Sequence, residues 1–123
     1  MDLGFAGQMV VGTDFGYTVA VEFGGGYEVR VETPFILRID GLDLEIEPGR
    51  DSDAPAVTQL SGRIVSLAAA DESGGLRIEF VGGARLLAEP DSNFEAWTVA
   101  GPGGLKVVCG PGGELSVWSP QGS

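Results

Sequence analysis

The chain contains the same β-strand unit twice. The run Val19–Glu32 aligns with Leu76–Glu89 so that apolar residues fall on apolar residues, Phe23 falls on Phe80, and a pair of glycines falls on a pair of glycines. An internal repeat constrains the fold more than any single motif, because one hairpin is barely stable in water and must bury its apolar face against its sibling. The repeat therefore predicts two related hairpins that pack on each other.

Alternation of apolar and polar residues predicts strands in both copies and beyond them. Glycines between the alternating runs predict tight hairpin turns. In the run 42–47 the alternation is strict, so we expect one set of side chains to face the core and the other to face water. The inward set is Leu42, Leu44 and Ile46, and the outward set is Asp43, Glu45 and Glu47.

The C-terminal third has the pattern of a meander. Strands are predicted at 95–99, 105–109 and 114–118, separated by two turns that contain Pro-Gly-Gly. Proline sets φ for the second position of such a turn, and the following Gly103 or Gly112 tolerates the positive φ of the third position. Trp97 and Trp118 are expected to close this meander as core or core-rim aromatics.

Together these patterns predict an all-β protein in which two related hairpin repeats form a sandwich or a partly open barrel. At most one short helix is expected, near residues 55–61. We expect a single domain, 1–123, divided as follows: repeat 1 at about 5–48, a connector at 49–59, repeat 2 at about 60–90, the meander at 94–118 and a loose tail at 119–123.

Three segments carry a resemblance to a known family. They are the opening of the second copy at 60–65, an aromatic-Glu-Ala-Trp motif at 94–97, and the run 103–118, which ends in Pro-Gly-Gly-Glu-Leu-Ser-Val-Trp. In these segments the chain resembles a family of small uncharacterised actinobacterial proteins built from two β repeats, with a domain of unknown function. The resemblance covers nearly the whole chain and implies no activity, cofactor or catalytic residue.

Residue types for catalysis and metal binding are scarce. The chain has no histidine and one cysteine, Cys109, which excludes His-assisted nucleophiles and an ordinary structural zinc site. Cys109 is expected to be an inert buried thiol, and no phosphate-binding loop is present. Glu22 and Glu79 are equivalent in the repeat, but strand alternation predicts that both point outward rather than forming a catalytic pair. We therefore expect no enzymatic activity and no cofactor.

Charge is the remaining functional signal. The formal net charge is -11, which disfavours nucleic acids and anionic membranes and favours a basic partner. Acidic residues are densest in the stretch 40–53, in which Arg50 is the one basic residue after Arg38. The candidate partner-binding residues in this stretch are Asp40, Asp43, Glu45, Glu47, Asp51 and Asp53. A solvated strand face and an oxygen-ligand Ca²⁺ site are the alternatives, although the spacing is not that of an EF-hand.

The sequence thus favours a non-enzymatic, acidic protein-binding module. One form of it is an immunity or antitoxin-like inhibitor that covers a basic partner. The alternatives are a structural module that forms a homodimer through strand edges or Trp118, and a β barrel that binds a small molecule between the repeats. A single cysteine and the lack of a targeting or membrane-spanning segment predict a cytoplasmic bacterial protein.

Overall fold

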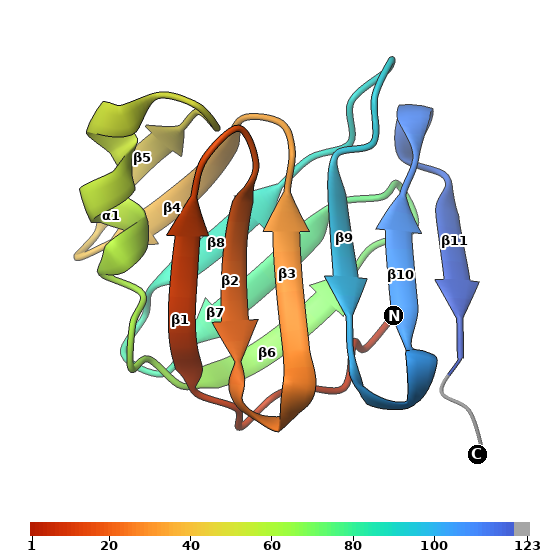
Figure 1. Cartoon of the computed structure of the whole chain (residues 1–123), viewed down its shortest axis with the longest axis horizontal. Coiled ribbons are helices and arrows are strands. Elements are labelled where there is room, and N and C mark those ends of the chain that lie inside the picture. The colour runs from red at the N-terminus through yellow and green to blue at the C-terminus, as the bar shows by residue number, and fades with distance from the viewer. Residues whose placement is uncertain (120–123) are drawn as a thin grey trace.

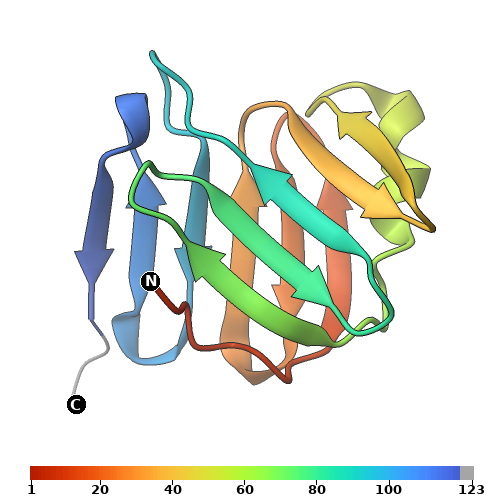
Figure 2. The same cartoon turned by 180° about the vertical axis from the view of Figure 1, so that it is seen from behind.

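Two antiparallel sheets pack face to face in the computed structural model of the chain, which describes residues 1–119 (Figures 1 and 2). The first sheet has the order β1-β2-β3-β9-β10-β11, with strands at Val10–Phe15, Val19–Phe23, Tyr27–Val31, Trp97–Ala100, Lys106–Cys109 and Leu115–Trp118. The second has the order β5-β4-β8-β7-β6, with strands at Leu42–Ile46, Phe35–Ile39, Arg85–Ala88, Leu76–Phe80 and Val65–Ala70. The predicted all-β fold is confirmed, in its sandwich form. Residues 120–123 of the predicted tail lie outside the described part of the chain.

The repeat is visible in the strand register. In the first copy Val19 pairs with Val31 across β2 and β3, and in the second copy Leu76 pairs with Ala88 across β7 and β8 at the equivalent positions. The strand before each hairpin also contains an irregularity at the same place: the register shifts after Val10 in β1 and after Val65 in β6. A shared bulge is a feature of backbone geometry that alternation of residue types alone does not require.

Each copy then sends its next two strands into the other sheet. The β4–β5 hairpin follows β3 along the chain but pairs with β8, and the β9–β10 hairpin follows β8 but pairs with β3. The registers again correspond, because Val29 faces Val99 where its equivalent Leu86 faces Leu37. The correspondence between the two copies therefore extends to β9 and β10, which the sequence had assigned to a separate meander.

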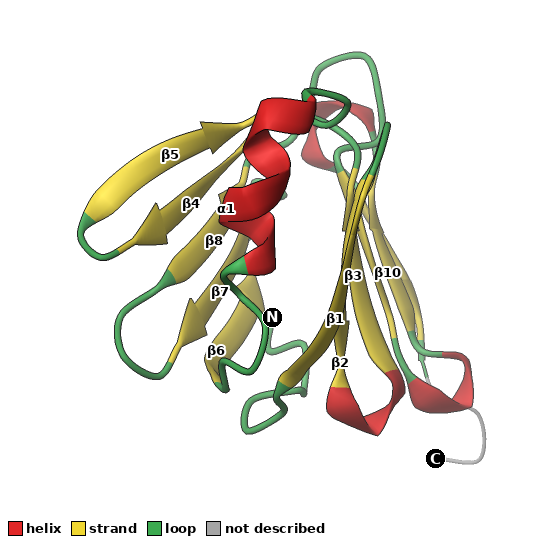
Figure 3. Cartoon of the chain, turned by 60° about the vertical axis from the view of Figure 1, so that its left-hand side comes forward, coloured by secondary structure: helices red, strands yellow, loops and turns green. Residues whose placement is uncertain are grey.

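A short helical segment closes one open side of the sandwich. A 3₁₀ turn at Asp51–Asp53 leads into α1 at Ala54–Thr58, which lies between the edge strands β1 and β5 (Figure 3). Val57 and Leu60 are buried there. The predicted short helix near residues 55–61 is confirmed, and Pro55 occupies its first turn, where a missing N–H costs nothing. Among residues 1–119, no helix combines the length and the apolar character that crossing a membrane requires.

The edge strands β6 and β11 differ in whether another segment covers their outer edge. The N-terminal segment covers the edge of β6, where Leu3 N–H donates to Ala68 O at 2.9 Å and Ala70 N–H donates to Met1 O at 2.9 Å. By contrast, among residues 1–119, β11 pairs with β10 alone. On this edge strand Val117 is 47% exposed and Trp118 is 53% exposed. Edge strands of this kind are the natural sites for pairing with another chain.

The core lies between the sheets and contains Trp97, the aromatic ring of Phe5 and the leucines and isoleucines of the inward faces. Ile46 faces this core as predicted, and Leu44 packs partly against it. The prediction for Leu42 was wrong, because its side chain is 66% exposed. The tip of the β4–β5 hairpin leans away from the first sheet, so no layer covers it (Figure 3).

Candidate functional site

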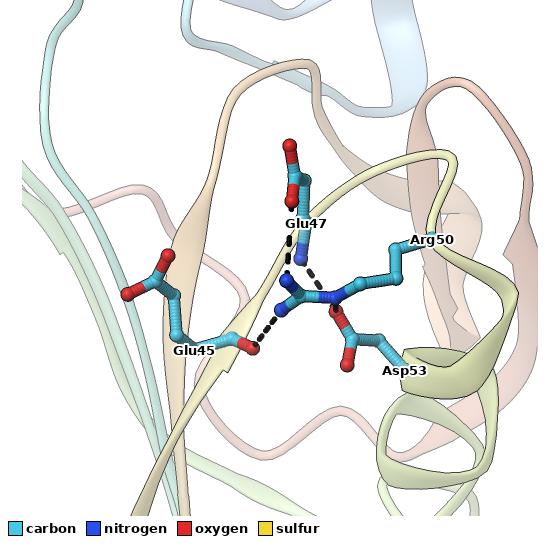
Figure 4. Close-up of polar contacts among 4 residues, drawn as sticks. All are labelled: Glu45, Glu47, Arg50 and Asp53. Atoms are coloured by element: carbon cyan, nitrogen blue, oxygen red, sulfur yellow. Dashed lines mark hydrogen bonds and ion pairs between the residues drawn. The ribbon is translucent and has the colours of Figure 1, made fainter.

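Arg50 organises the acidic stretch that follows β5 (Figure 4). Its Nε donates to Asp53 Oδ2 at 2.8 Å, its Nη1 to Glu47 Oε2 at 3.2 Å and its Nη2 to the backbone oxygen of Glu45 at 3.1 Å. Asp53 Oδ2 also accepts a hydrogen bond from the backbone N–H of Glu47 at 2.8 Å. We call Glu45, Glu47, Arg50 and Asp53 the Arg50 cluster.

The Arg50 cluster forms because the chain turns sharply after β5. Pro48 and Gly49 end the strand, Arg50 N–H donates to Glu47 O at 3.0 Å, and Asp53 N–H donates to Arg50 O at 2.9 Å. The hydrogen bond from the Glu47 N–H, with that from Arg50, lowers the pKa of Asp53. The bond to Asp53 in turn raises the pKa of Arg50. Both side chains therefore stay charged, and they neutralise each other in an ion pair.

The six predicted partner-binding residues do not form one patch. Arg38 holds Asp43 at 2.9 Å on the outer face of the second sheet, and Arg50 holds Glu47 and Asp53. The carboxylates of Asp40, Glu45 and Asp51 form no ion pair with any residue of 1–119. Asp40 lies in the turn between β4 and β5, with φ of 52°, at the opposite end of β5 from Glu47.

A second candidate region was missed in the sequence. Six residues line a surface hollow of about 410 Å³, which we call the Tyr17 hollow; they are Tyr17, Thr18, Glu32, Thr33, Phe94 and Glu95. Tyr17 is 93% exposed and Phe94 is 67% exposed, so both rings are presented to solvent. These residues come from three separate parts of the chain. The one signal that could have found them was an aromatic residue, Phe94, in a polar loop.

The Tyr17 hollow lies where three neighbouring strands of the first sheet meet their loops. Tyr17 and Thr18 precede β2, Glu32 follows β3, and Glu95 precedes β9. The backbone holds them in register, since Glu32 N–H donates to Ala96 O at 2.9 Å.

Arg30 reaches the edge of the Tyr17 hollow at Thr18 but pairs with a glutamate that does not line the hollow. Arg30 Nη1 donates to Thr18 Oγ1 at 2.7 Å, and its Nη2 lies 3.3 Å from Glu28. Within residues 1–119, Glu32 and Glu95 have no ion-pair partner.

The Tyr17 hollow adjoins the Arg50 cluster. Gly49 N–H donates to Gly16 O at 2.7 Å, which ties the loop before β2 to the turn before Arg50. Gly49 also lies beside the ring of Tyr17. One end of the molecule therefore carries both a set of carboxylates held by arginine and a set that is not.

The remaining candidates have structural surroundings. Cys109 is buried as predicted, its thiol donates to Gly74 O at 3.3 Å, and burial, with the nearby Asp71 charge, raises its pKa. Trp97 Nε1–H donates to the same oxygen at 2.9 Å. A thiol whose pKa is raised is a poor nucleophile.

The two equivalent glutamates lie on opposite outer faces of the sandwich, as strand alternation predicts. Glu22 on β2 stands opposite Glu28, and Glu79 on β7 is paired with Arg77 at 3.1 Å. They therefore form no carboxylate pair with each other. Across residues 1–119, no cluster of three or more metal-binding side chains (His, Cys, Asp or Glu) is present.

The chain matches a family of unknown function, DUF6188, over residues 1–119. It therefore belongs to this family. No curated protein and no solved structure gave a match.

Proposed function

We propose that this family member is a non-enzymatic protein-binding module for a basic partner, acting in the manner of an immunity or antitoxin-like inhibitor in the bacterial cytoplasm. The observation that supports it is the surplus of unneutralised carboxylates. The chain has 18 acidic and 7 basic residues, and four of the arginines are already engaged in ion pairs within the chain: Arg30, Arg38, Arg50 and Arg77. Most of the carboxylates within residues 1–119 therefore have no ion-pair partner in this part of the chain.

Such a charge distribution favours rapid capture of a cationic surface. A field of one sign raises the rate of encounter with a partner of opposite sign and suppresses contact with other acidic molecules. Asp40, Glu45 and Asp51 contribute to this field without a counter-charge in residues 1–119. The contacts of Arg50 with Glu47, Asp53 and the backbone oxygen of Glu45 have a different role, since they fix the turn that presents Asp51.

The experiment is affinity capture with the immobilised chain, at about 50 mM and about 500 mM salt, followed by mass spectrometry. We expect a partner with a basic surface that is retained at low salt and lost at high salt. A triple variant, Asp40→Lys, Glu45→Lys and Asp51→Lys, is expected to lose it. These positions are chosen because reversing Asp43 or Glu47 would also break an internal ion pair.

A matched control separates the location of charge from its amount. Glu22→Lys, Glu72→Lys and Glu114→Lys change the net charge equally at exposed positions elsewhere, and this variant is expected to retain most of the binding. Equal loss in both variants would show that only overall charge matters. Failure to capture any basic protein, or a partner indifferent to both variants, would refute the proposal.

A second candidate function is assembly through β11. Its outer edge has no strand partner within residues 1–119, and Val117 and Trp118 are about half exposed on it, at 47% and 53%. Pairing of β11 with its copy would extend the first sheet across a twofold axis. Sedimentation over a concentration series tests this: we expect a dimer that Val117→Lys abolishes, and a monomer at all concentrations would rule it out.

A further inference from the structure

We propose that the Tyr17 hollow is the anchor point for an arginine side chain of the basic partner. This inference rests on the proposed function and adds to it a specific chemical group and a specific location. The hollow combines two exposed aromatic rings with two carboxylates in about 410 Å³ at one end of the sandwich. The acidic stretch around β5 has no such combination.

The two aromatic rings of the hollow are exposed to solvent. Tyr17 is 93% exposed and Phe94 is 67% exposed, although large aromatic side chains are normally drawn into a core. Exposed tyrosine is characteristic of binding hot spots, since it offers a large, rigid surface at a small cost in conformational entropy. An aromatic face also attracts a cation that lies over it.

The carboxylates define the charge of the ligand. Glu32 and Glu95 line the same hollow, and neither is ion-paired with any residue between 1 and 119. Arg30 contacts the hollow at its lining residue Thr18, at 2.7 Å, but its ion pair is with Glu28, at 3.3 Å. The hollow is therefore complementary to a positive group supplied by another molecule.

Arginine fits this combination better than lysine. A guanidinium is planar, weakly hydrated and able to stack on an aromatic ring while its N–H groups donate to carboxylates in a fork. A lysine ammonium is more strongly hydrated and offers a point charge instead. The hollow also adjoins the Arg50 cluster through the Gly49–Gly16 hydrogen bond of 2.7 Å. A partner anchored here would lie close to Asp51.

The test is a titration of the ¹⁵N-labelled full chain with the peptide acetyl-Gly-Arg-Gly-amide, followed by NMR. We expect shift changes centred on Tyr17, Glu32, Phe94 and Glu95, with a dissociation constant in the millimolar range, as for a single weak contact. The citrulline peptide has the same shape without the charge and is expected to produce no saturable change. The lysine peptide is expected to bind several-fold more weakly than the arginine peptide.

Variants locate the site. Tyr17→Ala and Phe94→Ala are each expected to weaken binding of the arginine peptide about three- to tenfold, and Glu32→Gln with Glu95→Gln by a similar factor. The control variants Trp118→Ala and Glu114→Gln remove an exposed aromatic ring and a carboxylate on or beside β11, away from the hollow. Each is expected to change the affinity for the arginine peptide less than twofold. Folding of each variant is checked by its NMR spectrum without peptide.

The outcomes separate this inference from the proposed function. Equal shifts with the arginine and citrulline peptides, or shifts that do not centre on the hollow, would overturn the inference. A basic partner that is captured equally by the wild type and by the Tyr17→Ala, Phe94→Ala double variant would also overturn it, while leaving the proposed function standing. Specific binding of the arginine peptide at the hollow without any captured basic partner would support the hollow and contradict the function.

Discussion

The two exchanged hairpins, β4–β5 and β9–β10, occupy equivalent places in the duplicated fold and yet differ in exposure. Strands lie on both sides of β9–β10, with β3 beside one strand and β11 beside the other, whereas β5 ends the second sheet. In β9–β10, the enclosed hairpin, Trp97 and Cys109 are fully buried. In β4–β5, the edge hairpin, Ile46 is buried but Leu42 is 66% exposed. The same unit is thus enclosed in one place and has an exposed tip in the other.

This difference explains where the charge lies. The enclosed hairpin is anchored by two buried side chains on one backbone oxygen, Gly74 O, at 2.9 Å from Trp97 Nε1 and 3.3 Å from Cys109 Sγ. The edge hairpin instead has Asp43 and Glu45 on its solvent face, followed by the Arg50 cluster. Charges on an edge strand discourage unwanted pairing and leave it free to meet a partner.

The largest expected effect is on the enclosed hairpin. Trp97→Ala removes a fully buried ring and its hydrogen bond to Gly74 O, so we expect unfolding to become easier by about 3–5 kcal/mol. The measurement is urea unfolding followed by circular dichroism. Trp118→Ala is the control, with an expected change within about 0.5 kcal/mol because its side chain is half exposed. Comparable losses would show that burial in the enclosed hairpin does not give Trp97 its larger contribution to stability.

The next largest effect is the difference in stability cost between truncating a buried residue and an exposed residue of the edge hairpin β4–β5. Ile46 is 1% exposed and Leu42 is 66% exposed, although they lie on the same face of β5. Ile46→Ala is expected to cost about 2–4 kcal/mol, and Leu42→Ala less than about 0.5 kcal/mol. If Leu42→Ala were as costly as Ile46→Ala in urea unfolding, the tip of the hairpin would have to be covered in solution.

A smaller effect concerns the Arg50 cluster and its dependence on pH. The folded-state pKa of Asp53 is lowered from 3.8 by the hydrogen bond from the Glu47 N–H and by Arg50. Asp53 therefore adds stability above its unfolded pKa, and this contribution disappears as the pH falls through the lowered folded value.

Thermal unfolding from pH 7 to pH 2 measures this contribution. Asp53→Asn is expected to be less stable than the wild type near neutral pH, and the gap is expected to close below about pH 3.8. Asp51→Asn is the matched control, because Asp51 has no ion pair within residues 1–119, and it is expected to cost less stability than Asp53→Asn near neutral pH. A gap for Asp53→Asn that persists unchanged at pH 2 would contradict the assignment.

Much of the fold could be predicted from residue patterns. Alternation located the strands, and the repeat identified the two hairpins, because burial on one face of a sheet imposes a period of two on the sequence. The Pro-Gly-Gly turns were also predicted correctly, since Gly103 and Gly112 have φ of 72° and 77°. The exchange of β4–β5 and β9–β10 between sheets was not predicted, because alternation is the same whichever sheet a strand joins.

The candidate site was predicted less well, for a reason visible in the residues. Charge density along the sequence identified the acidic stretch but could not show that Arg38 and Arg50 neutralise Asp43, Glu47 and Asp53. Leu42 fits the alternation and is nevertheless exposed. Alternation shows on which face of a strand a side chain lies, but it does not show whether another layer packs against that face. The Tyr17 hollow is assembled from three strand ends, and no local pattern reveals such a juxtaposition.

Binding of a basic partner by the unneutralised carboxylates is the central feature of the proposed function. The direct test is the association rate of the captured partner with the chain, measured by biolayer interferometry from about 20 mM to about 200 mM salt. We expect the association rate to fall at least tenfold over this range while the dissociation rate changes little, as for encounter steered by charge. An association rate that does not depend on salt would contradict the claim.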